Sequence, residues 1–317
     1  MGRHFASVVS PNLVKMLVFC GKELVRGVPP LAGARNALAS SPGIGRPPRS
    51  EPGAAPASGV IPRIIFQTWK TRHDLPSNYS HWSSTFSALN PGYEHLIWDD
   101  ADNRDFIARK FPWFLACYDA YLREIYRADI IRYFFLYEYG GVYVDMDTEC
   151  LRPLDELKYS GEVVLGRMGT NTSFPHSIPN AIMASAPRQI FWLLVISMAI
   201  ERLRLHLAKG DLHLQGPEWM TGPILLKAAH DYYVSHDSMD TYNRVSEVLG
   251  NVGAESGARP GSVELLAPER WYPVDWNNRV HQLFRSAVVK KKRIPEPSES
   301  RWLFPQSDMV TYWTHSW

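Results

Sequence analysis

The sequence has few cysteines, little net charge and no long apolar run, and each shortage excludes a class of protein. Three cysteines in 317 residues, with no CxxC spacing, exclude a disulfide framework and a cysteine-based zinc site. The 34 basic and 32 acidic side chains nearly cancel, so the charge excess of a dedicated nucleic-acid binder is missing. No stretch reaches the roughly 18–20 apolar residues that cross a bilayer. Hydrophobic residues still make up 45% of the chain, which is enough to build a sizeable core.

The first 58 residues differ in composition from the rest of the chain. They carry seven Lys or Arg against two acids, and the part from Pro29 to Pro56 consists mainly of Pro, Gly, Ala and Ser. Such a segment cannot form a packed core. We therefore predict a disordered basic leader over 1–58 and one folded domain over 59–317. An acid-poor, Arg- and Ala-rich start is also typical of organelle transit peptides and of weak contacts with anionic membranes.

Strand and helix patterns alternate through the folded domain. An i, i+3, i+4, i+7 apolar series with a Gly140-Gly141 stop predicts a helix from Glu124 to Tyr139, and the apolar segment from Pro187 to about Leu207 predicts a second, buried helix. Strands interleaved with helices predict an α/β fold with a mostly parallel central sheet. The predicted strands, each a β-branched or aromatic run, are 63–67, 94–98, 142–144, 162–165, 263–266 and 309–313.

Two aspartates one residue apart stand at the end of the apolar run 142–144. In an extended chain, Asp145 and Asp147 point to the same side. Two carboxylates that close repel each other unless a cation or protons lie between them. The carboxyl edge of a parallel sheet is also where α/β proteins bind ligands, so we predict that the pair holds Mg²⁺ or Mn²⁺ together with a diphosphate. A second Asp-x-Asp, at 100–102, is followed by polar residues and is interpreted as a turn and a helix start.

The helix before this pair carries two charged residues on its otherwise apolar face. Asp129 and Arg132 are spaced i, i+3 and could form an intrahelical ion pair worth a few tenths of a kcal/mol. Buried charges need partners, however. A hydroxylated ligand with a phosphate would satisfy both side chains, the acid binding sugar hydroxyls and the arginine a phosphate oxygen.

Several spaced motifs accompany the aspartate pair. They are Ile61–Lys70, Asn90–Glu94 with Trp98, Phe111–Leu115 with Tyr118-Asp119, Arg127–Asp129, Arg132-Tyr133, Tyr139–Tyr143 and Asp145–Thr148. Together they resemble the family 32 glycosyltransferases, the group with a sugar-binding region containing a DXD motif. The mannosyl-inositol-phosphorylceramide synthase branch, which 111–119 resembles most, and the initiating α-1,6-mannosyltransferase branch are the most similar parts of that family. The resemblance covers about residues 60–190 well and 215–317 loosely.

The resemblance implies a GT-A type fold over 59–317, a nucleotide-sugar donor, Mn²⁺ or Mg²⁺, and retention of the anomeric configuration. It implies that Asp147 is the direct metal ligand and that Asp145 contacts the ribose and the metal shell. Related chains often end in a His-His-Trp-x-x-Ser-Trp-like stretch, and here the histidine is shifted. By position, His315 is the implied third metal ligand, Ser316 a further oxygen ligand and Trp317 a donor to the diphosphate. A frayed chain end is the alternative.

Further positions match the donor site of the family. The resemblance implies that Asp129 and Arg132 contact the donor sugar and phosphate and that Trp69 stacks on the nucleobase, with a core tryptophan as the alternative. The resemblance also implies that Asn180 contacts the sugar or the acceptor; the alternative is that it only forms a turn. Thr221-Gly222-Pro223 matches a loop of the family, although a plain turn would have the same spelling.

The resemblance also bears on substrates and location. It favours GDP-mannose as donor, with UDP-hexoses second, and a glycan, an inositol phospholipid or sphingolipid, or a bacterial polysaccharide as acceptor. A peripheral membrane contact is expected, at the cytoplasmic membrane face in a bacterium or in the Golgi of a eukaryote. The basic run at 290–293 is either a solvated loop or a contact for an anionic membrane.

Two other functions fit an Asp-x-Asp after an apolar strand. A haloacid-dehalogenase-like phosphohydrolase uses the first aspartate as nucleophile, but it needs Thr or Val two residues after the second, where this chain has Glu149. A non-catalytic sugar-binding module is the other alternative, and it would not need the metal pair.

Overall fold

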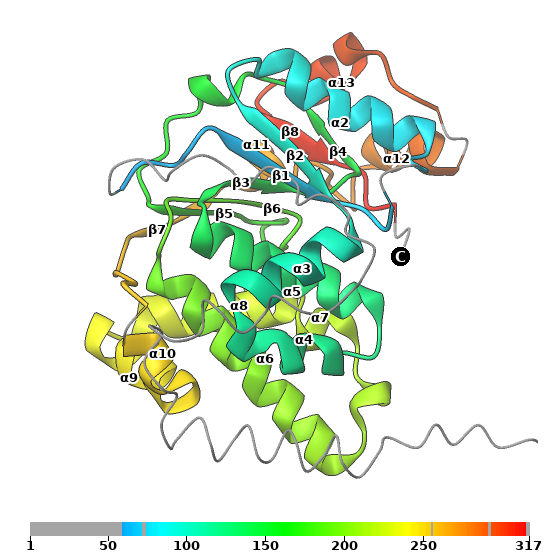
Figure 1. Cartoon of the computed structure of the whole chain (residues 1–317). Coiled ribbons are helices and arrows are strands. Elements are labelled where there is room, and N and C mark those ends of the chain that lie inside the picture. The colour runs from blue at the N-terminus through cyan, green and yellow to red at the C-terminus, as the bar shows by residue number, and fades with distance from the viewer. Residues whose placement is uncertain (1–58, 72–73, 255, 291–292, 315–317) are drawn as a thin grey trace, which may run out of the picture.

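The computed structural model describes residues 59–71, 74–254, 256–290 and 293–314, and its helices lie on both faces of a central sheet (Figure 1). The leader predicted for 1–58 lies outside the described residues. The central sheet has six strands, and a second, smaller sheet has two. The strands are β1 (Ile64–Thr68), β2 (Glu94–Trp98), β3 (Gly141–Val144), β4 (Thr148–Cys150), β5 (Val163–Gly166), β6 (Ile182–Ser185), β7 (Val263–Leu266) and β8 (Met309–Thr311).

The strand order of the central sheet is β2-β1-β3-β6-β5-β7. β1 runs parallel to β2 and β3, and β5 runs parallel to β7. β6 is antiparallel to both of its neighbours, β3 and β5. Five strands therefore share one direction and β6 opposes them, which confirms the prediction of an α/β fold with a mostly parallel sheet.

Side-chain alternation in β1 separates two cores. Ile64 and Phe66 pack into a cluster on one face of the sheet, while Ile65 packs into a cluster on the other. The face of Phe66 is covered by the helices from α3 to α9 (Figure 1). These are α3 (Asp100–Lys110), α4 (Leu115–Ala120), α5 (Glu124–Glu138), α6 (Ile190–Lys209), α7 (Pro217–Met220), α8 (Pro223–Ser235) and α9 (Ser238–Leu249), with α10 (Asn251–Ala254) beside α9.

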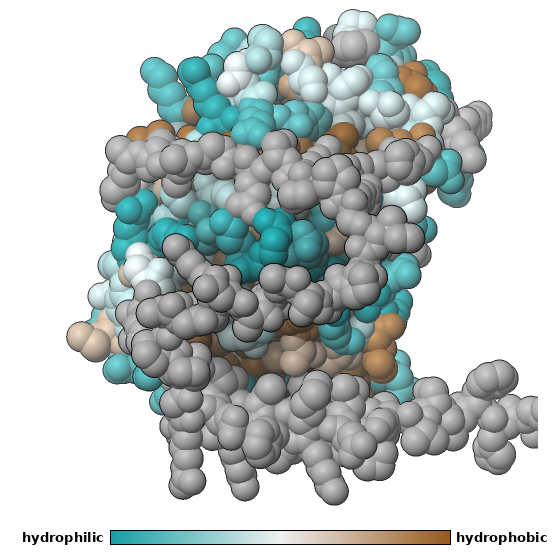
Figure 2. Space-filling model, in the orientation of Figure 1, coloured by the Kyte–Doolittle hydropathy of each residue, from teal (hydrophilic) through white to brown (hydrophobic). Residues whose placement is uncertain are grey.

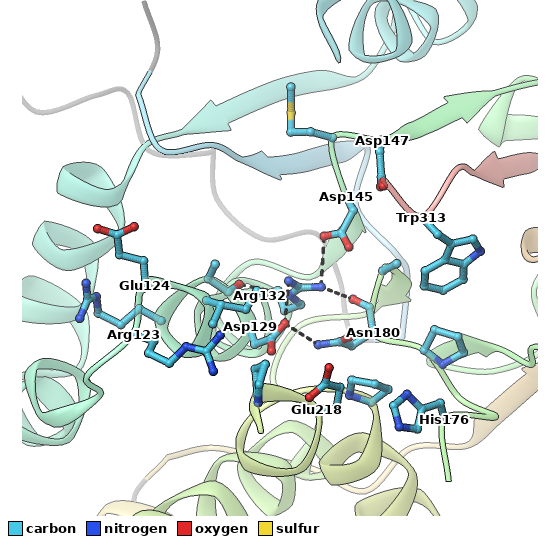
Figure 3. Close-up of a pocket in the computed structure, with 18 of the residues that line it drawn as sticks. Arg123, Glu124, Asp129, Arg132, Asp145, Asp147, His176, Asn180, Glu218 and Trp313 are labelled. Atoms are coloured by element: carbon cyan, nitrogen blue, oxygen red, sulfur yellow. Dashed lines mark hydrogen bonds and ion pairs between the residues drawn. The ribbon is translucent and has the colours of Figure 1, made fainter. Parts of the chain in front are cut away.

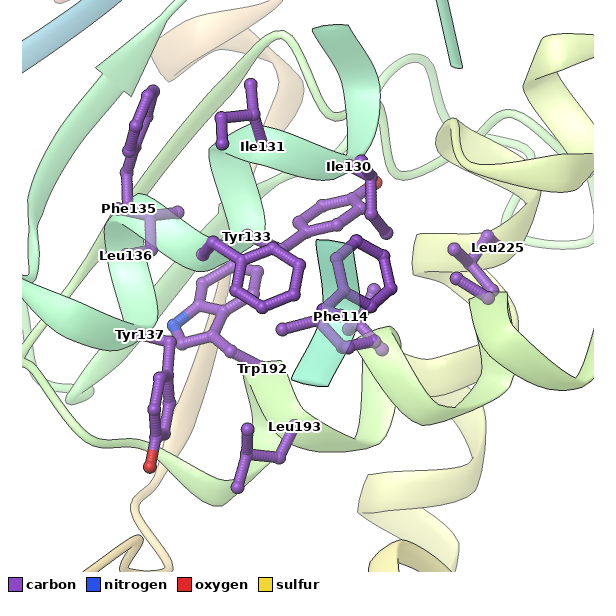
Figure 4. Close-up of a cluster of buried hydrophobic side chains, with 14 of the residues drawn as sticks. Phe114, Ile130, Ile131, Tyr133, Phe135, Leu136, Tyr137, Trp192, Leu193 and Leu225 are labelled. Atoms are coloured by element: carbon purple, nitrogen blue, oxygen red, sulfur yellow. The ribbon is translucent and has the colours of Figure 1, made fainter. Parts of the chain in front are cut away.

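The interior of this helical layer is formed largely by α5 and α6 (Figure 4). Both helices are buried on nearly all sides, as expected of helices whose apolar residues surround the axis. Tyr133 of α5 stacks on Trp192 of α6 with ring centroids 5.9 Å apart. Because α5 is enclosed in this way, two of its charged side chains, Asp129 and Arg132, are held inside the protein.

The opposite face of the sheet carries the small sheet and the remaining helices. β4 pairs antiparallel with β8, so the last described strand lies next to the segment that follows β3. A third cluster of buried apolar residues joins α2, α12 and β8. The helices of this layer are α2 (Ser77–Leu89), α11 (Pro268–Trp271), α12 (Arg279–Lys290) and α13 (Pro297–Leu303) (Figure 1).

The predicted elements are present, with shifts of up to three residues at their ends. β4 and β6 were not predicted, because their sequences, Thr-Glu-Cys and Ile-Met-Ala-Ser, contain no run of β-branched or aromatic residues. The second Asp-x-Asp does begin a helix, α3, with Asp99 as its N-cap, which confirms its interpretation. Figure 2 shows a mainly hydrophilic outer surface over α2 and α3. None of the described helices is long and apolar enough to span a membrane.

Candidate functional site

The aspartate pair lies in the turn between β3 and β4. β3 ends at Val144, and the Thr148 N–H donates to the Asp145 carbonyl at 3.1 Å, which closes a turn over Asp145–Asp147. The expectation of an extended chain at this point is therefore wrong. Both side chains nevertheless line the same cavity, because the turn lies at the edge of the sheet where β3 ends (Figure 3).

A cavity of about 940 Å³ opens at this edge. A volume of this size accommodates a ligand as large as a nucleotide sugar. Six residues predicted from the sequence line it: Trp69, Asp129, Arg132, Asp145, Asp147 and Asn180. The structure thus brings together positions that are spread over more than 100 residues of sequence.

Asp145 is held by two side chains that contact the same oxygen. Arg132 Nη1 lies 3.1 Å from Asp145 Oδ1, and the Tyr143 hydroxyl donates to that oxygen at 2.9 Å. The guanidinium also lies over the Tyr143 ring, 4.7 Å from its centroid. Burial raises the pKa of Asp145 to about 7, Arg132 opposes the rise, and the charge of Asp147 adds to it. Two carboxylates, of Asp129 and Asp145, contact the one guanidinium of Arg132, and the charge of Asp147 acts on Asp145 as well.

Arg132 is 1% exposed, and each of its guanidinium nitrogens has a protein partner. Nη2 forms an ion pair with Asp129 at 2.9 Å, which is the intrahelical pair expected from the spacing. Nη1 donates to the Asn180 carbonyl at 2.6 Å, and Nε donates to the Ala128 carbonyl at 3.2 Å. These contacts favour a role in holding Asp145 and Asp129, because a phosphate bound directly to Arg132 would have to displace them (Figure 3).

Asp129 is the centre of a buried polar network. Its Oδ1 accepts from the Asn180 amide at 3.0 Å and its Oδ2 from the Thr221 hydroxyl at 3.2 Å. The Tyr133 hydroxyl accepts from the same Asn180 amide at 3.2 Å and donates to the Thr221 carbonyl at 2.8 Å. Burial raises the pKa of Asp129, while Arg132, Asn180 and Thr221 oppose the rise. Sequence reasoning missed Tyr133 as a member of this network, although it lies next to Arg132.

Gly222 explains why the loop at 221–223 contains a glycine. A Cβ at this position would lie 2.9 Å from the Glu218 Cα and 3.1 Å from Asp129 Oδ2. The loop therefore approaches Asp129 more closely than a side chain at Gly222 would allow. This close approach is what brings the Thr221 hydroxyl within hydrogen-bond distance of the carboxylate.

Asp147 is held by the C-terminal part of the described chain. Its Oδ2 accepts from the Thr314 N–H at 2.7 Å and from the Thr314 hydroxyl at 3.0 Å, and its Oδ1 accepts from the Thr311 hydroxyl at 3.2 Å. The Thr314 hydroxyl also bonds the Tyr79 hydroxyl at 2.7 Å. Sequence reasoning missed both threonines. The pairing of β4 with β8, which delivers them, joins segments about 160 residues apart.

Two tryptophans contribute apolar surface to the cavity. Trp69 follows β1, packs on Tyr79 with ring centroids 4.7 Å apart, and donates its indole N–H to the Asp74 carbonyl at 3.2 Å. Trp313, which was not predicted as a site residue, also lines the cavity (Figure 3). Its ring stacks on Tyr272 with centroids 5.7 Å apart. Stacking of Trp69 on a nucleobase remains a prediction.

The residues of the site fit a divalent cation. Asp145 and Asp147 both present carboxylate oxygens to the cavity, and hard carboxylate oxygens are the ligands that Mg²⁺ and Mn²⁺ prefer. Both protein contacts of Asp145 are to Oδ1, which leaves Oδ2 for a ligand. Among the residues that the structure describes, no group of three or more His, Cys, Asp or Glu could hold a metal ion. The expected ligands His315 and Ser316, and the diphosphate contact Trp317, lie outside the described residues.

Comparisons with known proteins match the sequence resemblance. Residues 76–163 match the family model described as "Glycosyltransferase sugar-binding region containing DXD motif". The chain is 35% identical over 202 residues to inositol phosphoceramide mannosyltransferase 2 of Schizosaccharomyces pombe, covering 58% of this chain and 56% of that protein. It is 39% identical over 142 residues to a mannosyl phosphorylinositol ceramide synthase of Saccharomyces cerevisiae, covering 45% of this chain and 35% of that protein.

A third relative, the initiation-specific alpha-1,6-mannosyltransferase of Candida albicans, is 34% identical over 114 residues, covering 34% of this chain and 30% of that protein. The resemblance to the DXD glycosyltransferases and to these two branches is therefore confirmed. The matches span about half or less of the length of these relatives. The matched region of this chain includes Asp129, Arg132 and the aspartate pair.

Proposed function

We propose that the chain is a metal-dependent, retaining glycosyltransferase that moves a hexose from a nucleotide sugar to a hydroxyl of a glycan or glycolipid. The observation that carries this proposal is the joint presence of Asp145, Asp147 and the Asp129–Arg132–Asn180 network on one cavity. Mannose is the favoured sugar because the relatives are named as mannosyltransferases, which supports GDP-mannose as donor ahead of UDP-hexoses.

Asp145 and Asp147 would hold Mn²⁺ or Mg²⁺ at the turn after β3. When bound, the ion would neutralise charge on the departing nucleoside diphosphate. Arg132 fixes the position of Asp145, because it contacts that carboxylate on one side and Asp129 on the other. Thr311 and Thr314 fix the orientation of Asp147 in the same way. The chain thus preorganises both carboxylates before the donor binds, which is how a site stabilises developing charge at little cost in reorganisation.

Asp129 and Asn180 would bind the hydroxyls of the donor sugar. Both are buried at the base of the cavity and present acceptor and donor atoms side by side. The acceptor hydroxyl would attack from the side that the diphosphate leaves, and a diphosphate oxygen would take its proton. The sequence offers no convincing protein nucleophile for a double displacement, so retention is proposed to proceed without a covalent glycosyl-enzyme.

The test is a transfer assay on the full chain with a panel of nucleotide sugars, with Mn²⁺ present and after chelation. We expect GDP-mannose to be hydrolysed or transferred in a metal-dependent way, with retention of the anomeric configuration in the product. Asp147→Asn should abolish this activity at a small cost in melting temperature, because the amide keeps the shape of the partly buried carboxylate but loses one of the two acceptor oxygens that Thr311 and Thr314 contact.

The matched control is Asp105→Asn, an exposed aspartate of α3 that pairs with Arg109 away from the cavity. It should keep full activity. An inverted anomeric centre would refute the mechanism, and full activity in Asp147→Asn would refute the assignment of the aspartate pair. Phosphate release from phosphomonoesters would instead favour the phosphohydrolase alternative, and donor binding without turnover would favour the sugar-binding module.

A further inference from the structure

The segment 215–223, which contains α7, is fixed to the helical layer at several points. The Tyr126 hydroxyl donates to its first carbonyl at 2.6 Å, and the Tyr133 hydroxyl donates to a carbonyl near its end at 2.8 Å. Between these points, the Arg202 guanidinium of α6 donates to the Trp219 carbonyl and lies 4.4 Å from the centroid of the Trp219 ring. The beginning, the middle and the end of this short segment are therefore all held by side chains of α5 and α6.

The segment places the acid Glu218 in the cavity. Glu218 belongs to α7, and Figure 3 shows its carboxylate near Asp129, on the side of Asp129 that is away from Asp145 and Asp147. A Cβ at Gly222 would lie 2.9 Å from the Glu218 Cα and 3.1 Å from Asp129 Oδ2, so these two atoms flank one point in space. Burial is the main cause that raises the pKa of Asp129, and the charge of Glu218 adds to the rise. The two acids are therefore close neighbours on one wall of the cavity.

The contacts of Glu218 give it no structural use. Within the described part of the chain, its carboxylate has no hydrogen-bond or ion-pair partner, and the residue is exposed to the solvent in the cavity. The backbone that carries it is nevertheless held by two buried tyrosines, Tyr126 and Tyr133, and by the half-buried Arg202. A rigid support under a side chain without a protein partner is what a ligand contact needs, because the support holds the side chain in its binding position.

We propose that Glu218 binds a hydroxyl at the end of the donor hexose that lies away from its anomeric carbon, and thereby helps to select the sugar. This inference rests on the proposed function, in which Asp145 and Asp147 hold the diphosphate end of the donor and Asp129 contacts the sugar. Because Glu218 lies beyond Asp129 from the aspartate pair, it meets the far end of the ring, where carbons 3, 4 and 6 carry hydroxyls (Figure 3). A carboxylate without a cation in contact accepts a hydrogen bond from a neutral hydroxyl and repels a phosphate.

The experiment is a double-mutant cycle between Glu218 and the hydroxyls of the donor. The full chain is titrated, with Mn²⁺ present, with GDP, with GDP-mannose and with GDP-mannose analogues that lack the hydroxyl of carbon 3, 4 or 6. Binding is followed by tryptophan fluorescence, because Trp69, Trp276 and Trp313 line the cavity. The same series is run with UDP, UDP-hexoses and their deoxy analogues if a UDP-hexose binds the unchanged chain more tightly.

We expect Glu218→Ala to weaken GDP-mannose binding roughly ten- to a hundredfold, the effect of one lost hydrogen bond to a charged group, and to leave GDP binding unchanged. One of the three analogues should bind the unchanged chain about as weakly as GDP-mannose binds Glu218→Ala. That analogue should lose no further affinity in Glu218→Ala, because the hydroxyl and the carboxylate that contact each other are then both absent.

Two further variants separate this contact from general effects of charge. Glu218→Gln keeps the shape and one acceptor oxygen, so it should lose less affinity for GDP-mannose than Glu218→Ala. The matched control is Glu247→Ala, because Glu247 of α9 has a side chain that is 69% exposed and lies outside the cavity. It should bind GDP-mannose like the unchanged chain. All of these variants should keep the melting temperature, since neither glutamate is buried.

The outcomes distinguish a failure of this proposal from a failure of the proposed function. If the unchanged chain neither binds nor hydrolyses any nucleotide sugar, the donor assignment is wrong and the role of Glu218 falls with it. If the unchanged chain binds the donor and Glu218→Ala binds it equally tightly, only the role of Glu218 is refuted. The same holds if the losses are additive for all three missing hydroxyls. An equal loss of GDP affinity would assign Glu218 to the nucleotide and would also refute its contact with the sugar.

Discussion

Replacing Arg132 by methionine should destabilise the fold strongly, and this distinguishes the two roles that the sequence left open for it. The guanidinium lies between Asp129 at 2.9 Å and Asp145 at 3.1 Å, and it is almost completely buried. Methionine fills a similar volume but leaves the buried carboxylate of Asp129 and the half-buried carboxylate of Asp145 without their cation. Removal of one partner from a buried ion pair typically costs about 3–5 kcal/mol. We therefore expect a loss of this order in the free energy of unfolding.

The measurement is urea unfolding of the full chain followed by circular dichroism, together with the transfer assay. Arg104→Met is the matched control, because Arg104 forms a bidentate but exposed ion pair with Asp119. That pair should contribute no more than about 1 kcal/mol. Combining Arg132→Met with Asp129→Asn should recover part of the lost stability, since one of the two uncompensated charges is then removed.

The contrary result is equally specific. Suppose that Arg132 bound a donor phosphate and had no structural role. Arg132→Met would then lose as little unfolding free energy as Arg104→Met, while donor affinity would fall roughly ten- to a hundredfold, the effect of one lost charge-assisted hydrogen bond. That outcome would refute the positioning role derived from its contacts. It would also mean that the contacts to Asp145 and Asn180 give way when the donor binds.

Three further changes test other parts of the site. Gly222→Ala should lower the free energy of unfolding by about 1–3 kcal/mol and weaken donor binding, because the added Cβ would press on Glu218 and Asp129. Gly92→Ala is the control and should be tolerated, because its Cβ would have no atom within 4 Å. Urea unfolding and donor titration measure both effects. Thr314→Val should raise the Mn²⁺ concentration needed for half-maximal transfer with little change in melting temperature, because Asp147 loses a hydroxyl donor. Burial raises the pKa of the Cys150 thiol to about 12, so its alkylation at pH 8, followed by mass spectrometry, should be about a thousandfold slower in the folded than in the unfolded chain.

The fold was predictable where the sequence pattern is local. The parallel sheet follows from apolar runs separated by helical periods, and α5 follows from its i, i+3, i+4, i+7 series with the glycine stop. The same helix carried the signal for Asp129 and Arg132, since charges within an apolar helix need partners. What the pattern did not give is the identity of those partners. Asn180 and Asp145 come from other segments of the chain.

The remaining site residues depend on contacts that no local pattern records. Thr311 and Thr314 reach Asp147 because β8 pairs with β4, a three-residue strand without a sequence signature. The sequence pattern indicates only that Tyr143 is a core residue of β3. Its hydroxyl contacts Asp145 because of the turn that follows the strand. The extended geometry expected at this point was wrong because alternation applies only while the strand continues, and β3 ends one residue earlier.

The Asp-x-Asp sequences at 100–102 and 145–147 differ in the contacts of their carboxylates. In the first, Asp102 and Asp99 satisfy each other's backbone N–H groups in a capping box, so these acids serve a helix end. Asp100 still lines the cavity, and burial raises its pKa to about 6, but the cations that oppose the rise, Arg127 and Lys70, are half-buried and exposed. At the second pair the carboxylates meet a buried guanidinium on one side and the threonines of the chain end on the other. The sequence pattern is the same in both cases, but only the second pair has the surrounding charge and packing that the proposed cation site needs.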